Sequence, residues 1–550
     1  VTGALCIGQW PEAAMVMFLF ALAELIEAKS LDRARNAIRG LMAMTSESAT
    51  VQLPDGSWGE VPAKSVALES IVRVRPGERI ALDGVVIEGN STIDQSPITG
   101  ESLPVEKYPG EQVFAGTINQ AGSFQLRVTA VATNSTLTRI IHSVEAAQGS
   151  RAPTQRFVDQ FARVYTPAVF AVALALAVIP PLAFGGAWLE WVYKALVLLV
   201  IACPCALVIS TPVTIVSGLA AAARHGILIK GGVYLEEGRK LAWLALDKTG
   251  TITHGKPVQT DFDPLTGIDP LEVRCLAASL ASRSDHPVSH AIAVSAQSDG
   301  IITKDVTDFS ALIGRGVTGR IGDREYFLGN PRLMTENGFQ EPGLTNLIAS
   351  MERQGKSVVL LADKTHPLAL FGVADTIKES SREAITALHR LGVRTLMLTG
   401  DNQYTAEAIA RKVGIDEIKA GLLPEDKLTA IESLFGNGGT VGMVGDGVND
   451  APALARADIG FAMGAAGTDT AIETADVALM DDDLRKVALF VQLSRTTSAI
   501  LKQNITLALG IKAVFLGLTI MGHATMWMAV FADMGASLLV VGNGLRLLRK

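Results

Sequence analysis

Cysteine and aromatic side chains are scarce in this chain. Of its 550 residues four are cysteines, and aromatic residues make up 5%. Cys6 and Cys275 have no evident partner, so the sequence predicts no disulfide scaffold of the kind that holds small secreted domains together. The large polar regions are therefore expected to face a reducing compartment.

An excess of one charge is also lacking. The chain carries 48 basic and 55 acidic side chains, a net charge of −7 that is small for this length. This balance gives no indication of nucleic acid as a partner. We find no repeat of fixed period and no low-complexity segment.

Apolar residues, in contrast, make up 49% of the chain and gather in long runs. Length and apolarity predict five membrane-spanning helices. They cover residues 13–28, 164–184, 192–223, 505–521 and 524–541. The chain is therefore expected to contact a lipid bilayer along much of its length.

Basic residues after the first and last of these runs predict that both flanks are cytoplasmic. These residues are Lys29, Arg33, Arg35, Arg39, Arg546, Arg549 and Lys550. Val1 would then lie outside, although no signal peptide precedes it. We expect further helices upstream of this sequence, with room for a metal-binding domain.

Polar regions between the runs predict the soluble domains. Valine-rich runs separated by glycine turns indicate a β-rich domain over residues 44–150. Strands that alternate with helical patterns indicate a parallel α/β sheet over residues 241–257 and 371–490, interrupted by an inserted domain at 258–370. The membrane parts are then residues 1–43, 151–240 and 491–550.

Two thiols flank a proline within the third apolar run, in Cys203-Pro204-Cys205. Proline removes one helical hydrogen bond, which opens the helix locally. Thiolates are soft ligands suited to Zn²⁺ and Cu(I), and an unwound helix allows both to turn toward one ion. The alternative is a kinked helix whose thiols pack as small apolar groups.

Acidic turns follow several strands of the predicted α/β sheet. The segment Asp247-Lys248-Thr249-Gly250-Thr251 follows one apolar strand, Asp401 a second, and Asp446 and Asp450 a third. Since ligands bind beyond the carboxyl ends of parallel strands, these carboxylates should converge. Asp247 there could attack a phosphoryl group, with Lys427 as a charge on the phosphate. Asp446 and Asp450 would supply oxygen ligands for Mg²⁺.

With these motifs the chain resembles a P-type ATPase of the heavy-metal-transporting class, along its whole length. The resemblance implies an α-helical membrane bundle, a β-rich actuator domain, a haloacid-dehalogenase-like α/β phosphorylation domain and an inserted α+β nucleotide-binding domain. It also implies that ATP phosphorylates Asp247 within the motif that contains Lys248 and Thr249. Thr399 and Asp401 belong to the second loop of that domain, and Asp247, Asp446 and Asp450 would hold Mg²⁺.

Two further motifs carry roles that the resemblance implies. Thr99-Gly100-Glu101-Ser102, here called the actuator loop, places Glu101 to orient the water that hydrolyses the aspartyl-phosphate. The pair His286-Pro287 marks the nucleotide-binding domain, where the histidine helps to hold ATP. The residues assigned to the same pocket are Asp285, where the family commonly has glutamate, and Gly314, Gly316 and Gly329.

Lys512 and Asp533 lie 10 and 11 residues from Gly522, at the turn between the last two runs. At ~1.5 Å per residue they reach nearly equal depth, ~15 Å into the membrane, and can face each other. One interpretation is that Lys512 and Asp533 form an ion pair with a purely structural role. In the other, Asp533 completes an ion site with Cys203 and Cys205, and Lys512 replaces the ion after release, a pattern similar to the zinc, cadmium and lead exporters.

Four side chains on or beside the first run could receive or attract the ion. Glu12 and Met15 lie near its outer end, and Glu24 and Glu27 lie near its cytoplasmic end. The alternative is that these glutamates have no such role, because glutamates near a membrane surface are commonly just solvated side chains at the end of a helix.

The leading hypothesis is an ATP-driven exporter of Zn²⁺, Cd²⁺ or Pb²⁺ in a bacterial inner membrane, with its catalytic domains in the cytoplasm. A Cu(I) exporter of the same class is an alternative. Two others are a membrane metal sensor that no longer transports and a phosphatase tethered to the membrane.

Overall fold

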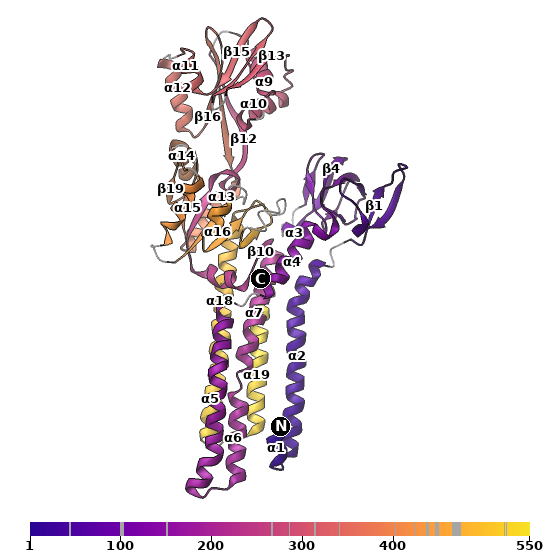
Figure 1. Ribbon diagram of the computed structural model, residues 1–550, viewed down its shortest axis with the longest axis vertical. Helices are drawn as coiled ribbons and strands as arrows, with labels where there is room; N and C mark the ends of the chain where they lie inside the picture. Colours follow the sequence, from indigo (N-terminus) through magenta and orange to yellow (C-terminus); the bar gives the residue numbers. More distant parts are fainter. Residues whose placement is uncertain are drawn as a thin grey trace.

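The computed structural model describes residues 1–42, 46–99, 104–149, 152–265, 268–284, 286–312, 315–339, 342–401, 403–422, 424–435, 439–445, 450–464, 475–521, 523 and 525–549. Within these ranges only the backbone is described at 23, 27, 30–42, 97, 140, 143–146, 148–149, 342, 424 and 520. Figure 1 shows a long helical bundle below, with an α/β domain and an inserted domain stacked above it and a β-rich domain at the side.

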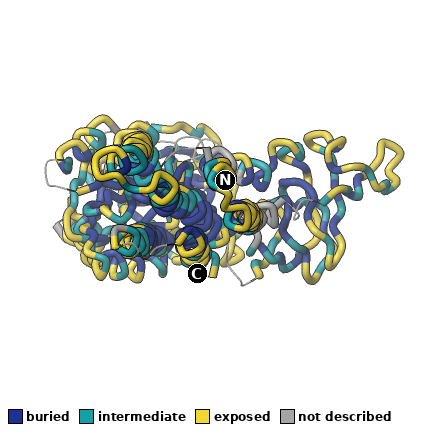
Figure 2. The backbone as a smooth tube through the Cα atoms, turned by 90° about the horizontal axis from the view of Figure 1, so that it is seen from below, coloured by how far each residue is buried: buried dark blue, intermediate teal, exposed yellow. Residues whose placement is uncertain are grey.

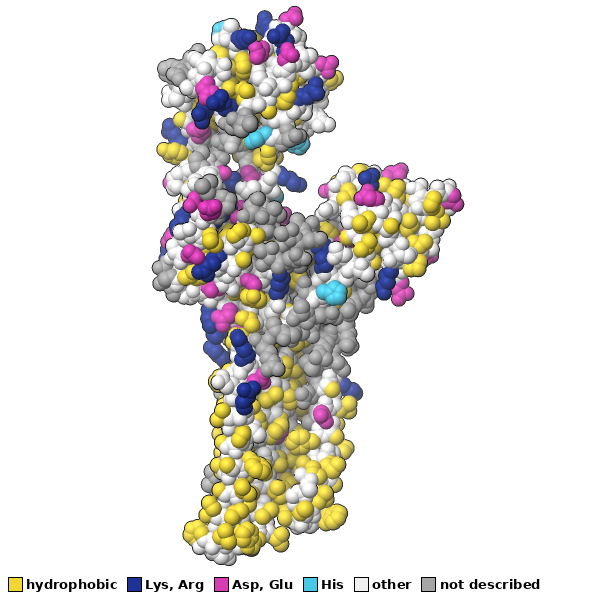
Figure 3. All heavy atoms as spheres, viewed as in Figure 1, with side chains coloured by type: hydrophobic (Ala, Val, Ile, Leu, Met, Phe, Trp, Pro, Cys, Tyr) yellow, Lys and Arg dark blue, Asp and Glu magenta, His cyan; other side chains and the backbone are white. Residues whose placement is uncertain are grey.

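Long helices build the lower half of the molecule. They are α2 (Trp10–Met42), α5 (Pro153–Phe184), α6 (Trp188–Ala202), α7 (Cys205–Arg224), α18 (Arg485–Ile520) and α19 (Met526–Leu545), with the short α1 (Thr2–Cys6) beside α2. The view from below shows buried residues between these helices and exposed ones around them (Figure 2). Apolar side chains dominate this outer surface, while most charged side chains on the visible face lie above it (Figure 3).

Four helical segments within the described ranges are long and apolar enough to cross a membrane. They are Pro153–Phe184, Trp188–Arg224, Arg485–Thr519 and Met526–Arg549. The expected fifth span, residues 13–28, lies within α2, which packs against α7 and α19 but is not among these four.

The expected single span over residues 192–223 is two helices. Helix α6 ends at Ala202 and α7 begins at Cys205, with extended backbone at Cys203 (φ −57°, ψ 124°). Proline at 204 has no amide proton for the helical ladder, which explains the break at this point. The backbone carbonyls of the last turn of α6 are thereby available to other donors.

Two antiparallel sheets form the β-rich domain. One has the order β2-β1-β3-β9-β4-β7 and the other β6-β5-β8. Their bounds are β1 Ser48–Gln52, β2 Trp58–Pro62, β3 Ile71–Val74, β4 Gly84–Glu88, β5 Ser91–Asp94, β6 Val105–Lys107, β7 Gln112–Val113, β8 Ile118–Asn119 and β9 Phe124–Val128. The short helix α3 (Ser96–Thr99) leads into the actuator loop, and α4 (Thr136–Gly149) leads back toward the membrane.

A seven-stranded sheet with the order β10-β22-β21-β20-β11-β18-β19 forms the α/β domain. All neighbours are parallel except β10 and β22. The strands are β10 Ile227–Ile229, β11 Leu241–Asp247, β18 Arg394–Leu398, β19 Glu417–Lys419, β20 Thr440–Gly445, β21 Ile459–Ala462 and β22 Val477–Leu479. Its helices are α8 Gly232–Glu237, α13 Glu379–Arg390, α14 Gln403–Val413, α15 Pro424–Glu432 and α16 Ala451–Arg456.

A six-stranded antiparallel sheet with the order β12-β17-β16-β15-β14-β13 forms the inserted domain. Its strands are β12 Thr253–Pro264, β13 Thr307–Leu312, β14 Gly316–Ile321, β15 Arg324–Gly329, β16 Ser357–Asp363 and β17 Pro367–Ile377. Its helices are α9 Pro270–Ala281, α10 Pro287–Ser298, α11 Pro331–Glu336 and α12 Pro342–Arg353. The paired strands β12 and β17 connect it to the α/β domain, and Figure 1 shows it farthest from the membrane helices.

Candidate functional site

Asp247 ends the central strand β11, where the apolar run Leu244-Ala245-Leu246 is fully buried in the sheet. A strand covered on both faces reads as a continuous apolar run, so the first polar residue emerges at the carboxyl edge. Lys427 Nζ donates to Asp247 Oδ1 at 2.6 Å and to Asp450 Oδ1 at 2.8 Å. The two aspartates are only 7% and 2% exposed, so one ammonium group joins two carboxylates in a nearly dry pocket.

The charges of this pocket act on one another. Burial by itself lowers the pKa of Lys427, but the carboxylates of Asp247 and Asp450 outweigh burial and raise that pKa above its usual value. Lys427 is therefore positively charged at neutral pH. A permanent positive charge beside Asp247 suits the binding of a phosphoryl group.

A second lysine and carboxylate flank Asp247. Lys248 Nζ forms an ion pair with Asp401 Oδ2 at 2.7 Å, so two strand ends of the sheet are joined at the predicted edge. Thr399 is 2% exposed, and its Oγ1 accepts a hydrogen bond from the amide of Asp401 at 3.1 Å. This bond fixes the turn after β18. Asp446 and Glu101 lie outside the described residues.

The loop after Asp247 is fixed by a lysine that the sequence analysis missed. Lys378, at the end of β17, is 4% exposed and donates from Nζ to the carbonyl of Gly250 at 2.5 Å. Gly250 has a φ of 74°, which favours glycine there. Burial, only partly offset by Asp482, lowers the pKa of Lys378. A lone lysine after a strand gives no recognisable signal in the sequence.

The inserted domain contains a pocket of about 410 Å³ whose lining includes Ser284, His286, Arg315, Gly316 and Gly329. His286 begins α10, where its Nδ1 accepts a hydrogen bond from the amide of Val288 at 3.3 Å. A Cβ at Gly316 or at Gly329 would collide with the backbone of the opposite strand. The two glycines therefore allow the neighbouring strands to approach closely beside the pocket. The predicted contacts Asp285 and Gly314 lie outside the described residues.

The candidate metal site in the membrane lies at the break between α6 and α7. Ligand atoms of Cys203, Cys205 and Asp533 all lie within 4.8 Å of one another, and Asp533 is 6% exposed. The structure joins the two sulfurs as a disulfide. Thiolates, not a disulfide, bind metal ions, so the reduced pair is the form that could hold an ion with Asp533.

Lys512 of α18 reaches the same site. Its Nζ lies 3.0 Å from Asp533 Oδ1 and 3.1 Å from the carbonyl of Ile201, and it also donates to the carbonyl of Cys203. Ile201 lies in the last turn of α6 and Cys203 directly follows that helix, so the break at Pro204 leaves both carbonyls available to Lys512. The sulfur ligands and the ammonium group thus surround one carboxylate.

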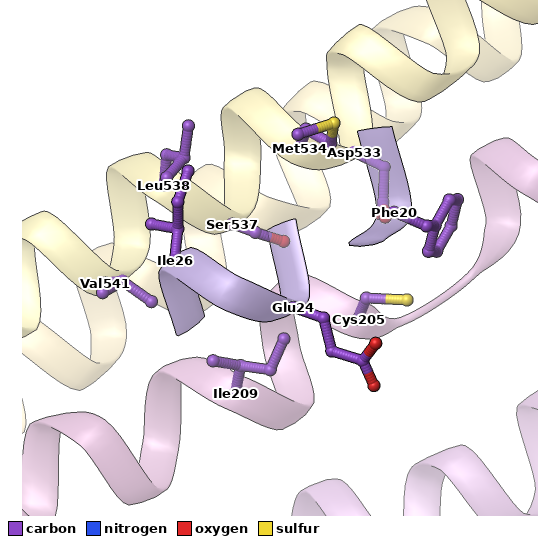
Figure 4. Close-up of a pocket in the computed structure, with 10 residues that line it drawn as sticks. All are labelled: Phe20, Glu24, Ile26, Cys205, Ile209, Asp533, Met534, Ser537, Leu538 and Val541. Atoms are coloured by element: carbon purple, nitrogen blue, oxygen red, sulfur yellow. The ribbon is translucent and has the colours of Figure 1, made fainter. Parts of the chain in front are cut away.

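A cavity of about 260 Å³ opens beside this site, between α2, α7 and α19. Figure 4 shows Glu24, Cys205 and Asp533 among its lining residues. Glu12, at the other end of α2, accepts a hydrogen bond from the hydroxyl of Tyr193 at 3.2 Å. Met15 packs in the apolar cluster beside it, and the side chain of Glu27 is outside the described residues.

Family models match two parts of the chain. Residues 43–145 match the P-type ATPase actuator domain, and residues 242–458 match the haloacid dehalogenase-like hydrolases. The latter range includes Asp247, Asp401 and Asp450. The former contains the β-rich domain and the actuator loop.

Relatives of known name match the whole chain. A probable cadmium-transporting ATPase of Staphylococcus aureus (strain MRSA252) is 48% identical, covering 100% of this chain and 76% of that protein. The zinc/cadmium/lead-transporting P-type ATPase of Escherichia coli (strain K12) is 43% identical, covering 100% of this chain and 74% of that protein.

A solved structure agrees with these relatives. The crystal structure of a zinc-transporting PIB-type ATPase in the E2·Pi state superimposes with a TM-score of 0.68 at 42% identity, covering 100% of this chain and 89% of that one. The fold expected from the sequence is thereby confirmed. This chain belongs to the heavy-metal-transporting P-type ATPases.

Proposed function

We propose that this protein exports a divalent heavy-metal cation, Zn²⁺, Cd²⁺ or Pb²⁺, from the cytoplasm of a bacterium through its inner membrane, using ATP. One observation carries the choice of ion: a buried carboxylate lies within 4.8 Å of two sulfurs, beside a lysine. Sulfur with oxygen suits borderline divalent ions better than Cu(I), which favours sulfur alone.

The phosphorylation step uses the carboxylate of Asp247. One oxygen forms a bond to the γ-phosphorus of ATP as the bond to the β,γ-bridging oxygen breaks, which yields an aspartyl-phosphate and ADP. Lys427, 2.6 Å from Asp247, is placed to neutralise the charge of the transferred phosphoryl group. In the later hydrolysis Glu101 orients a water molecule, which attacks the phosphorus and releases phosphate and the free carboxylate.

The residues around Asp247 fit a magnesium ion. Asp247 and Asp450 turn oxygens to the same ammonium group, at 2.6 and 2.8 Å, and both are nearly buried. Hard cations prefer such oxygen ligands, and Mg²⁺ supplies further neutralisation of the phosphate. Asp446, which precedes Asp450 in the segment after β20, would be a third ligand.

ATP is assigned to the pocket of the inserted domain. Its volume of about 410 Å³ offers space for a ligand, and its lining includes His286 and Arg315 beside the glycines Gly316 and Gly329. The paired strands β12 and β17 connect this pocket to the strand end at Asp247. The inserted domain would carry the nucleotide to Asp247.

The transported ion is assigned to Cys203, Cys205 and Asp533. Lys512 now makes hydrogen bonds that such an ion would replace, because its ammonium group lies on Asp533 and on two backbone carbonyls. Two cations cannot share one buried carboxylate at low cost. Return of Lys512 to Asp533 would therefore favour release of the ion. Glu24, at the cavity, and Glu12, at the far end of α2, would lie on its path.

The test measures ATP hydrolysis and acid-stable phosphoenzyme in purified, reduced protein with a panel of metal ions. We expect stimulation by Zn²⁺, Cd²⁺ and Pb²⁺, loss of both signals in Asp247→Asn, and loss of metal stimulation in Cys203→Ser. Cys6→Ser, an exposed cysteine, is the matched control. Stimulation by Cu(I) alone would contradict the choice of ion, and absence of phosphoenzyme would contradict the transport cycle.

A further inference from the structure

A buried amide group joins three helices of the membrane bundle. Asn504 of α18 is 0% exposed. Its Nδ2 donates to the carbonyl of Val540 in α19 at 3.1 Å and to Oγ1 of Thr214 in α7 at 3.3 Å. Its Oδ1 accepts a hydrogen bond from Nδ2 of Asn543, also in α19, at 2.9 Å. A carbonyl can only accept, so the bond to Val540 determines which end of the amide is the donor. The two amide protons therefore hold α18 to α19 and to α7.

The acceptor in α7 is itself held in place. Thr214 is fully buried and donates its hydroxyl proton to the carbonyl of Ser210 at 2.6 Å, so its oxygen has a lone pair for Asn504. A Cβ at Gly544 would lie 2.8 Å from Thr214 Oγ1, so α19 and α7 are in close contact at this level. Separating the three helices here would leave buried polar groups without partners, and the bonds of Asn504 therefore resist it.

These bonds lie at one depth, between the candidate metal site and the α/β domain. From the site to the bonds there are 8 positions along α18, 9 along α7 and 7 along α19, counted from Lys512, Cys205 and Asp533. At ~1.5 Å per residue the separations are ~12, ~14 and ~11 Å. Figure 1 shows α18 leaving the α/β domain, and α7 and α19 running back toward it. Asn504 therefore joins, one layer above the site, the three helices that carry its groups.

The same two neighbouring helices carry acceptors of Lys512. Its Nζ lies 3.0 Å from Asp533 of α19, and it also donates to the carbonyl of Cys203, two residues before α7 begins. Asn504 lies about two turns away on the helix of the lysine. Two turns of an intact helix move together, because each residue is bonded to the next turn. Bonds that hold α18 against α7 and α19 at Asn504 therefore also hold the ammonium group on its acceptors.

We infer that Asn504 is a positioning residue that holds Lys512 on Asp533, and that it thereby opposes binding of the transported ion and favours its release. The inference rests on the proposed function, in which the ion and the ammonium group compete for this carboxylate. Bonds made in the metal-free form stabilise it relative to a form in which α18 has shifted to admit the ion. By linkage, weakening these bonds raises the affinity for the ion. Loss of a residue that merely supported the site would lower that affinity instead.

The test measures Cd²⁺ binding to purified, reduced wild-type protein and Asn504→Leu, by the ultraviolet absorption of cadmium–thiolate bonds. Leucine has a similar size and makes no side-chain hydrogen bond. The dissociation constant should fall roughly tenfold, which corresponds to the net contribution of one to two neutral hydrogen bonds. The maximal Cd²⁺-stimulated ATPase rate should also fall, because release of the ion becomes slower. Thr506→Val, at an exposed threonine of the same helix, is the matched control and should behave as wild type.

A milder variant keeps the test valid if Asn504→Leu does not fold. Thr214→Val removes one partner of the amide with little change of shape. It should lower the dissociation constant of Cd²⁺ by a smaller factor, about threefold, since one neutral hydrogen bond is lost. Unchanged or weaker binding of Cd²⁺ in the folded single variants would overturn the inference.

A double variant shows whether Asn504 acts through the lysine. Adding Asn504→Leu to Lys512→Met should leave the Cd²⁺ affinity of Lys512→Met unchanged, because no ammonium group remains to be positioned. A tenfold gain in affinity that persists without Lys512 would also overturn the inference. Wild-type protein that shows no cadmium–thiolate absorption would instead contradict the proposed function.

Discussion

The phosphorylation site and the membrane site use the same pair of groups in opposite surroundings. Lys427 lies 2.6 Å from Asp247, and Lys512 lies 3.0 Å from Asp533. In the α/β domain a second aspartate shares the lysine, so the pocket carries an excess of negative charge. In the membrane the pair stands nearly alone, with two sulfurs and two backbone carbonyls around it.

The difference indicates what each carboxylate can do. Excess negative charge beside Lys427 suits a magnesium ion, which favours oxygen ligands, and leaves Asp247 free to react. The single charge of Asp533 is balanced by Lys512, so a divalent ion must displace the ammonium group to bind. The site at Asp247 therefore suits formation of a covalent bond to phosphorus. The site at Asp533 suits the exchange of an ammonium group for a metal ion.

Asp247→Asn should give the largest effect that separates the two sites. An amide oxygen is a far weaker nucleophile than a carboxylate, so phosphoenzyme and metal-stimulated ATPase activity should fall roughly a thousandfold or more. Metal binding to the reduced protein, measured by equilibrium dialysis, should persist. Asp299→Asn, in the inserted domain, serves as the exposed control. Parallel loss of metal binding would mean that the two sites are not separate.

Asp533→Asn should give the complementary result. Without the oxygen ligand, metal-stimulated ATPase activity should fall about a hundredfold, the size expected when an important metal ligand or its support is removed. Phosphorylation of Asp247 by labelled inorganic phosphate needs no transported ion and should remain. Loss of this reverse reaction as well would show that Asp533 supports the fold of the whole molecule.

Lys512→Met tests whether the ammonium group compensates Asp533 in the absence of metal. Removing one partner of a buried pair leaves an uncompensated charge, at a cost of about 3–5 kcal/mol. Thermal unfolding of metal-free protein should therefore begin at a clearly lower temperature, and Zn²⁺ or Cd²⁺ should restore much of the loss. Lys502→Met is the matched control. Equal stability of both variants without metal would contradict the role of Lys512.

Asp416→Asn should give the smallest effect, away from both sites. Burial alone would raise the pKa of Asp416, but hydrogen bonds from Thr395 and the nearby His389 outweigh it and lower the pKa. A depressed pKa stabilises the folded state above the unfolded value, and this stability is lost as pH falls through the folded value. The variant should lose about 0.5–1 kcal/mol at pH 7, allowing for solvent screening.

The pH dependence gives the check on Asp416. Thermal unfolding of wild-type protein and Asp416→Asn should differ at pH 7, and the difference should shrink as pH falls toward 3. Asp323→Asn, in an exposed turn, should match the wild type throughout. A constant difference would assign the effect to lost packing instead of charge.

Much of the fold was predictable because local patterns determine it. The apolar strand before Asp247 and the turn after it indicated a strand end, and the equal spacing of Lys512 and Asp533 from one turn indicated a common depth. The break at Pro204 follows from the missing amide proton. These features depend on neighbours in sequence, which a single chain displays.

Other features depend on how distant segments meet. Lys378 holds Gly250 only because β17 returns beside β12, and Lys486 holds Thr99 only because two domains meet at the end of the sheet. Neither lysine stands in a recognisable motif.

Helix α18 runs without interruption from Arg485 to Ile520, with Lys486 near one end and Lys512 near the other. The 26 positions between these lysines correspond to ~39 Å along a rod. For a rod of that length, a tilt of about 5° about its upper end moves the lower lysine by roughly 3 Å, which is the length of its bond to Asp533. A change of angle too small to disturb packing at the top would therefore suffice to separate ammonium from carboxylate at the bottom.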